Sequence, residues 1–296
     1  MSTKSAFVSI IGRPNVGKSS LLNKLLGEKI AIVSDKPQTT RNKIIGVLTE
    51  GEYQYVFIDT PGMHKPKNKL STYMIKQIEE AAFDGDGVIF MTDSTSELTE
   101  IEKKMIETIK SQNMPSILLL NKTDLVEDKE FLLKKIAQIH EMFHFNEVIP
   151  ISVLSGEGID DVKIAINSFA AEGPHYFPED TLTDQPERVI VAEIIREKIL
   201  KYMRDEIPHG VAVTVDQMKD RPNGNMTDID ITILCEKSSH KGMIIGKQGS
   251  CLKKIASEAR ADIEDFLDIK VNLKCWVKVK EDWRNQERVI KELGFN

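Results

Sequence analysis

The sequence of 296 residues has few cysteines and no long apolar stretch. Its three cysteines, Cys235, Cys251 and Cys275, lie far apart and form no CxxC pair, so neither a disulfide framework nor a zinc site is predicted. This usage indicates a reducing, cytosolic compartment. No segment approaches the ~18 uninterrupted apolar residues that a membrane span needs, and the first residues carry no apolar signal segment. Secretion and membrane insertion are therefore not predicted.

An overall excess of positive charge is also absent. The formal net charge is −6, and the 41% hydrophobic and 29% charged residues are typical of a globular chain. Collagen-like, fibrous and wholly disordered proteins are thereby excluded. Residues 237–280 differ, because ten lysines and arginines face five aspartates and glutamates there, which gives this window +5 and the remainder −11. The charge is therefore unevenly spread along the chain, and a charge run of this kind is usually a solvated face.

The length predicts two domains. Residues 1–172 alternate short apolar runs with helical patterns, which is typical of an α/β domain with a doubly wound, mostly parallel sheet. Residues 173–186 contain three prolines and interrupt the periodicity, so they are predicted to be a linker. Residues 187–296 are predicted to form a smaller α+β domain of order αββααβ, whose sheet has one buried and one wet face.

The expected elements follow from apolar periodicity. In the first domain the strands are predicted at 7–11, 44–48, 53–58, 87–91, 116–120 and 148–151, with helices after residue 18 and near 71–82, 98–112, 128–143 and 158–171. In the second domain a helix is predicted over 187–204, strands near 211–215, 229–235 and 271–279, and helical segments on both sides of 246–249.

A phosphate-binding motif, GxxxxGK[ST], lies between the first predicted strand and the first predicted helix. Its residues are Gly12, Arg13, Pro14, Asn15, Val16, Gly17, Lys18 and Ser19. Backbone N–H groups and the helix dipole there face phosphates, Lys18 is predicted to reach the β- and γ-oxygens, and the Ser19 hydroxyl to ligate Mg²⁺. The alternative is a glycine turn that caps an ordinary helix.

A carboxylate follows another predicted strand in the segment Asp59, Thr60, Pro61 and Gly62. Asp59 is predicted to hold Mg²⁺ through water, and the Gly62 N–H to sense a γ-phosphate. Turns are rich in aspartate and glycine, so this motif is weak by itself.

The base is predicted from Asn121, Lys122, Thr123 and Asp124, which follow a third apolar strand. A carboxylate at 124 can accept hydrogen bonds from N1–H and the 2-amino group of guanine, whereas adenine offers neither donor. A buried carboxylate without these partners is costly, so strong discrimination is expected. Lys122 can lay its methylenes over the ring, and Asn121 would brace the loop.

The three motifs, in this order, resemble the translation-factor-like P-loop GTPases. The resemblance implies GTP and Mg²⁺ as ligands and places the first switch at residues 36–41. It favours Thr40 as the threonine that joins Ser19 and Asp59 on the metal, with Thr39 as the alternative. Ser152 and Val153 resemble the loop that receives the guanine O6, although the family usually has alanine where Val153 stands.

Met63 stands where most small GTPases carry the glutamine that orients the attacking water, and an apolar side chain cannot orient it. The sequence here resembles GTPases in which potassium, held partly by an asparagine matching Asn15, supplies the missing charge. The residues implied in catalysis are therefore Asn15, Lys18, Thr40 and Gly62, with slow turnover in the absence of an activating partner. The alternative for Asn15 is an ordinary loop hydrogen bond.

Residues 244–255 resemble the KH signature, and the surrounding order αββααβ is that of its type II form. Two glycines let the backbone approach a sugar–phosphate chain, and the next helix start offers free N–H groups. The predicted RNA-binding residues are Gly246, Lys247, Gln248, Gly249, Lys253 and Lys254. Trp276 is either a base-stacking platform or a partly buried aromatic with its N–H satisfied, and the second is favoured.

Residues 175–180, 183–184 and 188–197 resemble the junction of the Era family, bacterial GTPases with a C-terminal KH domain, and the likeness runs from about Val8 to Val279. It implies a monomeric cytoplasmic protein that binds small-subunit ribosomal RNA near its 3′ end and acts in assembly of the small ribosomal subunit. The family is also loosely associated with the membrane, which no amphipathic basic helix or lipidation signal supports independently. The alternatives are a GTPase acting on transfer RNA and a nucleotide-stabilised RNA-binding scaffold without significant turnover.

Overall fold

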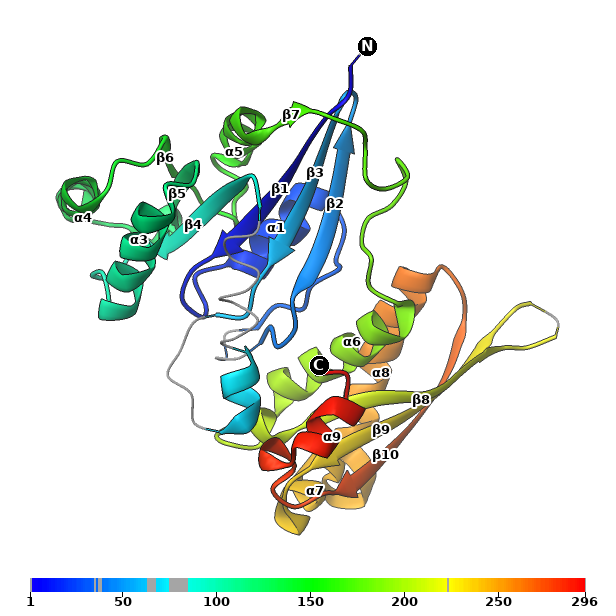
Figure 1. The fold of residues 1–296 in the computed structure, drawn as a ribbon. Coiled ribbons are helices and arrows are strands. Elements are labelled where there is room, and N and C mark those ends of the chain that lie inside the picture. Colours follow the sequence, from blue (N-terminus) through cyan, green and yellow to red (C-terminus); the bar gives the residue numbers. More distant parts are fainter. Residues whose placement is uncertain are drawn as a thin grey trace. The chain divides into compact units, whose positions relative to one another are not determined.

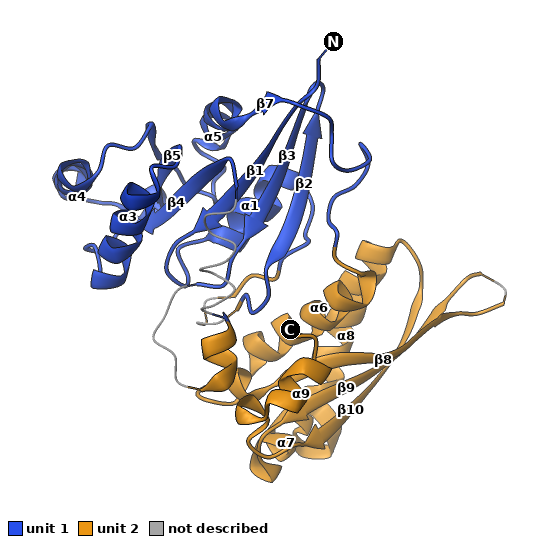
Figure 2. Cartoon of the chain, viewed as in Figure 1, with its two compact units in different colours: residues 1–31, 40–65, 74–184 blue, residues 32–39, 66–73, 185–296 orange. Residues whose placement is uncertain are grey.

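The computed structural model describes residues 2–34, 36, 39–62, 68–74, 85–222 and 224–295 (Figure 1). The chain forms two compact units, shown in different colours in Figure 2. The first unit comprises Met1–Ala31, Thr40–Lys65 and Met74–Asp184. The second comprises Ile32–Thr39, Pro66–Tyr73 and Gln185–Asn296. Two short segments from the N-terminal part of the sequence therefore belong to the unit that the C-terminal residues build.

A seven-stranded sheet forms the centre of the first unit, with the order β2-β3-β1-β4-β5-β6 and β7 paired with β1. The strands are β1 (Lys4–Ile11), β2 (Ile44–Glu50), β3 (Tyr53–Asp59), β4 (Gly87–Asp93), β5 (Ser116–Asn121), β6 (Glu147–Pro150) and β7 (Ala171–Glu172). Strands β3, β1, β4, β5 and β6 are parallel neighbours, whereas β2 pairs antiparallel with β3 at one edge and β7 pairs antiparallel with β1. The mostly parallel α/β sheet is confirmed. Strand β7 was not predicted, because two residues are too short for any period.

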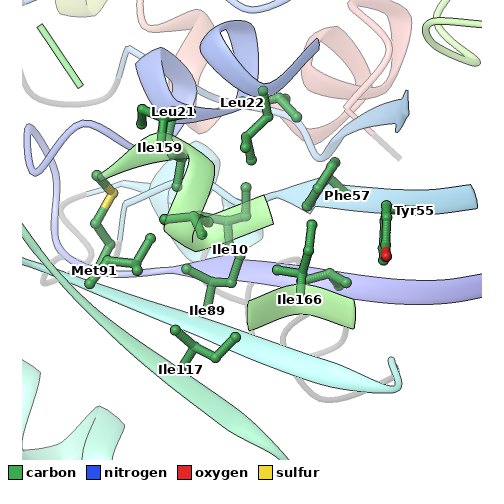
Figure 3. Close-up of a cluster of buried hydrophobic side chains, with 14 of the residues drawn as sticks. Ile10, Leu21, Leu22, Tyr55, Phe57, Ile89, Met91, Ile117, Ile159 and Ile166 are labelled. Atoms are coloured by element: carbon green, nitrogen blue, oxygen red, sulfur yellow. The ribbon is translucent and has the colours of Figure 1, made fainter. Parts of the chain in front are cut away.

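Helices cover both faces of this sheet, which is why its central strands read as continuous apolar runs. They are α1 (Lys18–Leu26), α3 (Glu100–Gln112), α4 (Lys129–Met142) and α5 (Ile159–Ala165). Figure 3 shows Leu21 and Leu22 of α1 and Ile159 of α5 packed over Ile10 and Ile89 of the sheet. Helices α3 and α4 bury their apolar residues in a second cluster with β4 and β5. Burial of each such side chain contributes about 1.5–3 kcal/mol to the stability of the fold. The loops at the strand ends are therefore attached to a rigid core.

Helix α3 begins with a capping box. Thr99 Oγ1 accepts a hydrogen bond from the Glu102 N–H at 3.3 Å, and Glu102 Oε2 accepts one from the Thr99 N–H at 2.9 Å. Glu102 is fully buried, so its carboxylate is fixed at the start of the helix. The predicted helix near 71–82 is helical at residues 69–74, and its remainder lies outside the described residues.

The second unit has the predicted order αββααβ. It consists of α6 (Glu187–Tyr202), β8 (Ala212–Asp220), β9 (Thr227–Cys235), α7 (Ser238–Ile245), α8 (Ser250–Leu267) and β10 (Val271–Val279). The sheet order is β10-β9-β8, with β9 antiparallel to β8 and parallel to β10. Inward residues of β9 pack with α6 and α8 in one core. A further helix, α9 (Glu287–Glu292), was not predicted.

Short 3-10 turns complete the described chain: η1 (Thr123–Leu125), η2 (Ile166–Phe169), η3 (Pro208–Gly210), η4 (Lys247–Gly249) and η5 (Trp283–Asn285). Among the helices in the described ranges, none combines the length and apolar character that a membrane crossing requires.

Candidate functional site

The phosphate loop connects β1 to α1, and its lysine is buried. Lys18 is only 6% exposed, and its Nζ donates to the carbonyl oxygens of Gly12 and Arg13, both at 3.1 Å. Burial lowers the pKa of Lys18 to about 8, although the charge of Asp59 opposes this shift. The N-cap of α1, Gly17, makes no side-chain capping hydrogen bond, so the first N–H groups of the helix face the loop. This arrangement fits a phosphate chain.

Three oxygen-bearing side chains gather beside the phosphate loop. Ser19 Oγ donates to Asp59 Oδ2 at 2.6 Å and lies 2.8 Å from Thr40 Oγ1. Thr39 is turned elsewhere, since its hydroxyl donates to the Lys36 carbonyl at 2.6 Å. The geometry therefore favours Thr40 over Thr39 as the third member of the cluster.

Asp59 is fully buried, and burial raises the pKa of its carboxyl group to about 6. Its Oδ1 has no hydrogen-bond partner within the described part of the chain. A buried, unsatisfied carboxylate oxygen beside two hydroxyls is a donor set that suits Mg²⁺, which prefers oxygen ligands and is often held by only one or two carboxylates plus phosphate. The residues present therefore fit the predicted metal.

The segment after β3 packs directly on the phosphate loop. Thr60 Oγ1 donates to the Ile10 carbonyl at 3.0 Å. At Gly62 an added Cβ would lie 2.6 Å from the Pro14 nitrogen, so only glycine fits this approach. Pro61 is buried between these contacts. Met63 lies outside the described residues, and the prediction that depends on its side chain stays a prediction.

The predicted base loop is tied to the phosphate loop through Asn121. Its Nδ2 donates to the Val16 carbonyl at 2.7 Å, and its Oδ1 accepts from the Val153 N–H at 3.0 Å. A Cβ at Gly17, where φ is 107°, would lie 2.4 Å from Asn121 Nδ2. Three loops thus meet on one side chain.

Asp124 is exposed at the start of the turn that follows the base loop. The carboxylate is therefore not buried in the protein alone. The turn holds position 124 at the surface, and the desolvation cost arises only when a base covers it. Lys122 adopts φ 69°, and Ser152 is fully buried under the loop that carries Val153.

One further residue at this edge, Asp93, was missed from the sequence. It is the last residue of β4 and lies opposite Asn121 in the register of β4 and β5. Lys122 Nζ donates to its Oδ2 at 2.7 Å. The signal was present, because Asp93 ends an apolar strand in the same way as Asp59 does.

The KH-type loop lies between α7 and α8. Gly246 and Gly249 have φ values of 73° and 78°, and Gln248 between them has 51°. Lys247, Gln248 and Lys253 are exposed, and α8 begins without a side-chain cap. Free N–H groups and exposed ammonium groups at one loop suit a sugar–phosphate backbone.

Lys254 is exposed as well, but its Nζ lies 4.4 Å from the centre of the Tyr202 ring on α6. This cation–π contact directs Lys254 toward the α6 side of the unit.

The favoured interpretation of Trp276 is wrong. Its side chain is 46% exposed, with no hydrogen bond from its N–H among the residues described. Strand β10 alternates, so Trp276 shares the wet face with the exposed Lys274 and Lys278. The tryptophan that is buried with a satisfied N–H is Trp283, which donates to the Gly210 carbonyl at 2.8 Å.

Known families match both units. Residues 7–122 match the family described as 50S ribosome-binding GTPase, and residues 206–284 match the KH domain. The chain is 52% identical over 295 residues to GTPase Era of Alkaliphilus metalliredigens, with 100% of both chains covered. It is 50% identical over 293 residues to GTPase Era of Clostridioides difficile, with 99% of each covered.

Two crystal structures are similar over the whole chain. One is a single-residue variant of Aquifex aeolicus Era bound to GDP·AlF4⁻, and the other is Era in complex with MgGDPNP and nucleotides 1506–1542 of 16S ribosomal RNA. Each is 37% identical with a TM-score of 0.95, and 99% of both chains is covered.

Proposed function

The chain belongs to the Era family of GTPases. On this premise we propose that GTP binding and hydrolysis in its first unit control RNA binding by its second unit. The RNA is small-subunit ribosomal RNA near its 3′ end, and it is bound during assembly of that subunit. The observation that carries the proposal is that hydrogen bonds join the three nucleotide loops: Asn121 of the base loop contacts the phosphate loop, and Ser19 of the phosphate loop contacts Asp59. The same chain also has a KH loop.

Each loop has a separate role in the proposed nucleotide site. Lys18 binds the β- and γ-phosphates, and Asp124 accepts hydrogen bonds from the guanine base. Ser19, Thr40 and Asp59 hold Mg²⁺, which when bound neutralises charge on the phosphate oxygens. The Gly62 N–H lies where the strand end meets the phosphate loop, as a γ-phosphate sensor requires.

The RNA site is proposed at residues 246–254, with Trp276 on the wet face of β10 as a separate position for base stacking. The KH loop offers backbone groups and lysines to phosphates, and the exposed Trp276 offers a ring on which an unpaired base can stack. A related Era was crystallised with 16S ribosomal RNA, and this likeness supports RNA of the small subunit over transfer RNA.

Coupling between nucleotide and RNA is proposed to run through Val33 and Thr39, which belong to the second unit. Within that unit the Arg196 guanidinium on α6 donates to the Thr39 carbonyl, and Glu197 Oε1 accepts from the Val33 N–H at 3.1 Å. The next residue in the chain, Thr40, lies at the metal cluster. When GTP orders Thr40, the peptide bond to Thr39 transmits that order to α6.

The direct test measures the affinity of the full-length protein for a labelled RNA covering the 3′-terminal region of small-subunit RNA. The measurement is made at one salt concentration with GDP and with a non-hydrolysable GTP analogue. We expect at least a fivefold difference in Kd, because coupling free energies are typically about 1–3 kcal/mol. Equal affinities would contradict control by nucleotide.

The paired substitution Lys247→Asp and Gln248→Asp is the matched test of the RNA site. Two carboxylates at this loop repel phosphates, so RNA binding should weaken and its salt dependence should flatten. Unchanged binding would place the RNA contacts elsewhere. The Glu130→Gln and Lys134→Gln pair on α4, which removes an exposed ion pair, is the control.

The scaffold alternative loses its basis, because members of this family are GTPases and a relative binds GDP·AlF4⁻. Potassium stimulation remains part of the proposal and rests on Met63 and Asn15. Phosphate release measured in potassium and in sodium chloride tests it, with Lys18→Ala as the inactive control.

We further propose a cytoplasmic monomer with peripheral membrane contact. Sedimentation equilibrium tests the monomer. Co-sedimentation with anionic vesicles, in each nucleotide state, tests the membrane contact.

A further inference from the structure

One carboxylate in the first unit receives a cation from each of two nucleotide-binding loops. Asp93 Oδ2 lies 2.7 Å from Nζ of Lys122 in the base loop and 3.7 Å from a guanidinium nitrogen of Arg13 in the phosphate loop. The two cations come from segments more than 100 positions apart in the sequence. Asp93 therefore links the loop for the phosphates to the loop for the base.

The position of this carboxylate is tightly determined. Its side chain is 9% exposed, and its other oxygen, Oδ1, accepts from the Thr95 N–H at 2.9 Å and from Thr95 Oγ1 at 2.6 Å. Burial by itself raises the pKa of Asp93, but the hydrogen bonds from Lys122 and Thr95 outweigh it and hold the pKa below its usual value. The group is thus a fixed anion at neutral pH.

A second buried carboxylate holds Arg13 on its other side. Arg13 Nε lies 3.4 Å from Oε1 of Glu102, the fully buried capping residue of α3, and an Arg13 amino group donates to Ser96 Oγ at 2.6 Å. Because α3 and β4 belong to the rigid core, the phosphate loop is anchored to a support that does not depend on nucleotide.

Lys135 of α4 contacts the end of β4 that carries Asp93. It is 4% exposed, and its Nζ donates to Thr92 Oγ1 at 3.0 Å and to the Asp93 carbonyl at 2.6 Å. Thr92 in turn donates to Glu102 at 2.7 Å. Hydrogen bonds from Lys122 and Thr95 occupy both oxygens of the Asp93 carboxylate, and buried polar networks fix side-chain geometry closely, so Asp93 has little freedom to follow a displaced Lys122.

We propose that Asp93 is a positioning residue for nucleotide recognition, which holds Lys122 of the base loop extended for the purine and ties it, through Arg13, to the phosphate loop. The inference rests on the proposed roles of Lys122 and Asp124 at the base. A free lysine must lose the freedom of four rotatable bonds to lie along a purine ring, and the ion pair removes that freedom before nucleotide binds.

The test is a double-mutant cycle on the full-length protein with GDP and Mg²⁺, with Kd and dissociation rate measured from a fluorescent GDP analogue. Asp93→Ala should weaken binding about tenfold, the scale for loss of a charge-assisted hydrogen bond. In a Lys122→Met background, which keeps the methylenes but not the ammonium, the same substitution should change Kd by less than about threefold. A tenfold loss in both backgrounds would show a merely structural role and overturn the inference.

Asp93→Asn is the conservative variant in case Asp93→Ala does not fold, because asparagine has the shape of aspartate and keeps one acceptor oxygen. It should give an intermediate loss that also disappears in the Lys122→Met background, and full affinity for this variant in the parent background would reject the proposal. Glu130→Gln, an exposed carboxylate that pairs with Lys134 at 2.7 Å on α4, is the control and should bind GDP as the parent does.

Asp124→Asn separates this inference from the proposed function. If that variant still prefers guanine to xanthine, the base assignment itself has failed. If it turns to xanthine while Asp93→Ala leaves GDP binding intact, only the role of Asp93 is rejected.

Discussion

The side-chain amide of Asn121 donates a 2.7 Å hydrogen bond to the carbonyl oxygen of Val16, and both partners are buried. One side chain at the end of β5 thereby holds the loop that precedes α1. The carboxyl ends of parallel strands meet at one edge of such a sheet, so the two loops were expected to be close. The structure adds that they are physically joined.

Asn121→Ala should therefore weaken GDP binding without unfolding the protein. The substitution leaves the buried Val16 carbonyl unpaired, which costs about 1–3 kcal/mol. The phosphate and base loops are then no longer held together, and the Kd for GDP should rise roughly 5- to 150-fold, the range for a coupling of about 1–3 kcal/mol between two sites, measurable by calorimetry. Gln112→Ala, which removes an exposed amide at the end of α3, is the control and should leave Kd unchanged.

Asp124→Asn should lose guanine and gain xanthine. The amide donates where the carboxylate accepted, and the 2-carbonyl of xanthine needs a donor. Competition of GDP and xanthosine diphosphate against a fluorescent nucleotide measures the change. Unchanged preference for GDP would remove Asp124 from the base site.

Gly62→Ala should lower GTP hydrolysis more than GDP binding. Its Cβ would meet the Pro14 nitrogen at 2.6 Å, so the segment after β3 must shift away from the proposed γ-phosphate position. Single-turnover phosphate release and GDP affinity are compared in the same preparation. Gly242→Ala in α7, where an added Cβ meets nothing within 4 Å, should leave hydrolysis unaltered and should stabilise its helix by about 0.5–1 kcal/mol.

Arg196→Lys should reduce the coupling of nucleotide to RNA. Arg196 donates to Glu193 at 2.7 Å and also to the Thr39 carbonyl, and a lysine cannot reproduce this planar fork. The expected result is a ratio of RNA affinities, GTP analogue over GDP, that moves toward one. Lys201→Gln, on an exposed position of the same helix, should keep the parent ratio, and a parent ratio in Arg196→Lys would exclude this route.

Cys275 should react slowly with alkylating reagents at pH 8. Burial disfavours the charged thiolate and raises the pKa of Cys275 to about 11. The thiolate is then a far smaller fraction at pH 8 than the roughly one quarter of an ordinary thiol of pKa ~8.5. The rate, followed by mass spectrometry of the modified peptide, should rise about tenfold per pH unit up to pH ~10. Rapid modification at pH 8 would contradict the burial.

Elements whose structure is decided by local chemistry could be predicted from the sequence. Strand β10 was predicted over 271–279 and has those bounds, because strict alternation marks each of its residues. The phosphate loop and its neighbours were found because a strand end, glycines and a lysine act together within eight residues.

Features whose structure is decided by contacts between distant segments could not be predicted. Trp276 was assigned the wrong environment, since nothing in a single strand says which neighbour covers an aromatic ring. Asp93 was overlooked because its importance comes from Arg13 and Lys122, which only the sheet register brings to it. Membership of residues 32–39 in the second unit had no local signal either.

Because two upstream segments belong to the second unit, that unit cannot be obtained complete by cutting the chain at the linker. A polypeptide that starts at residue 185 would contain most of the second unit but not the two upstream segments that fold with it. Such a fragment would lack part of the packing of its own unit, so RNA measurements should be made on the full-length chain.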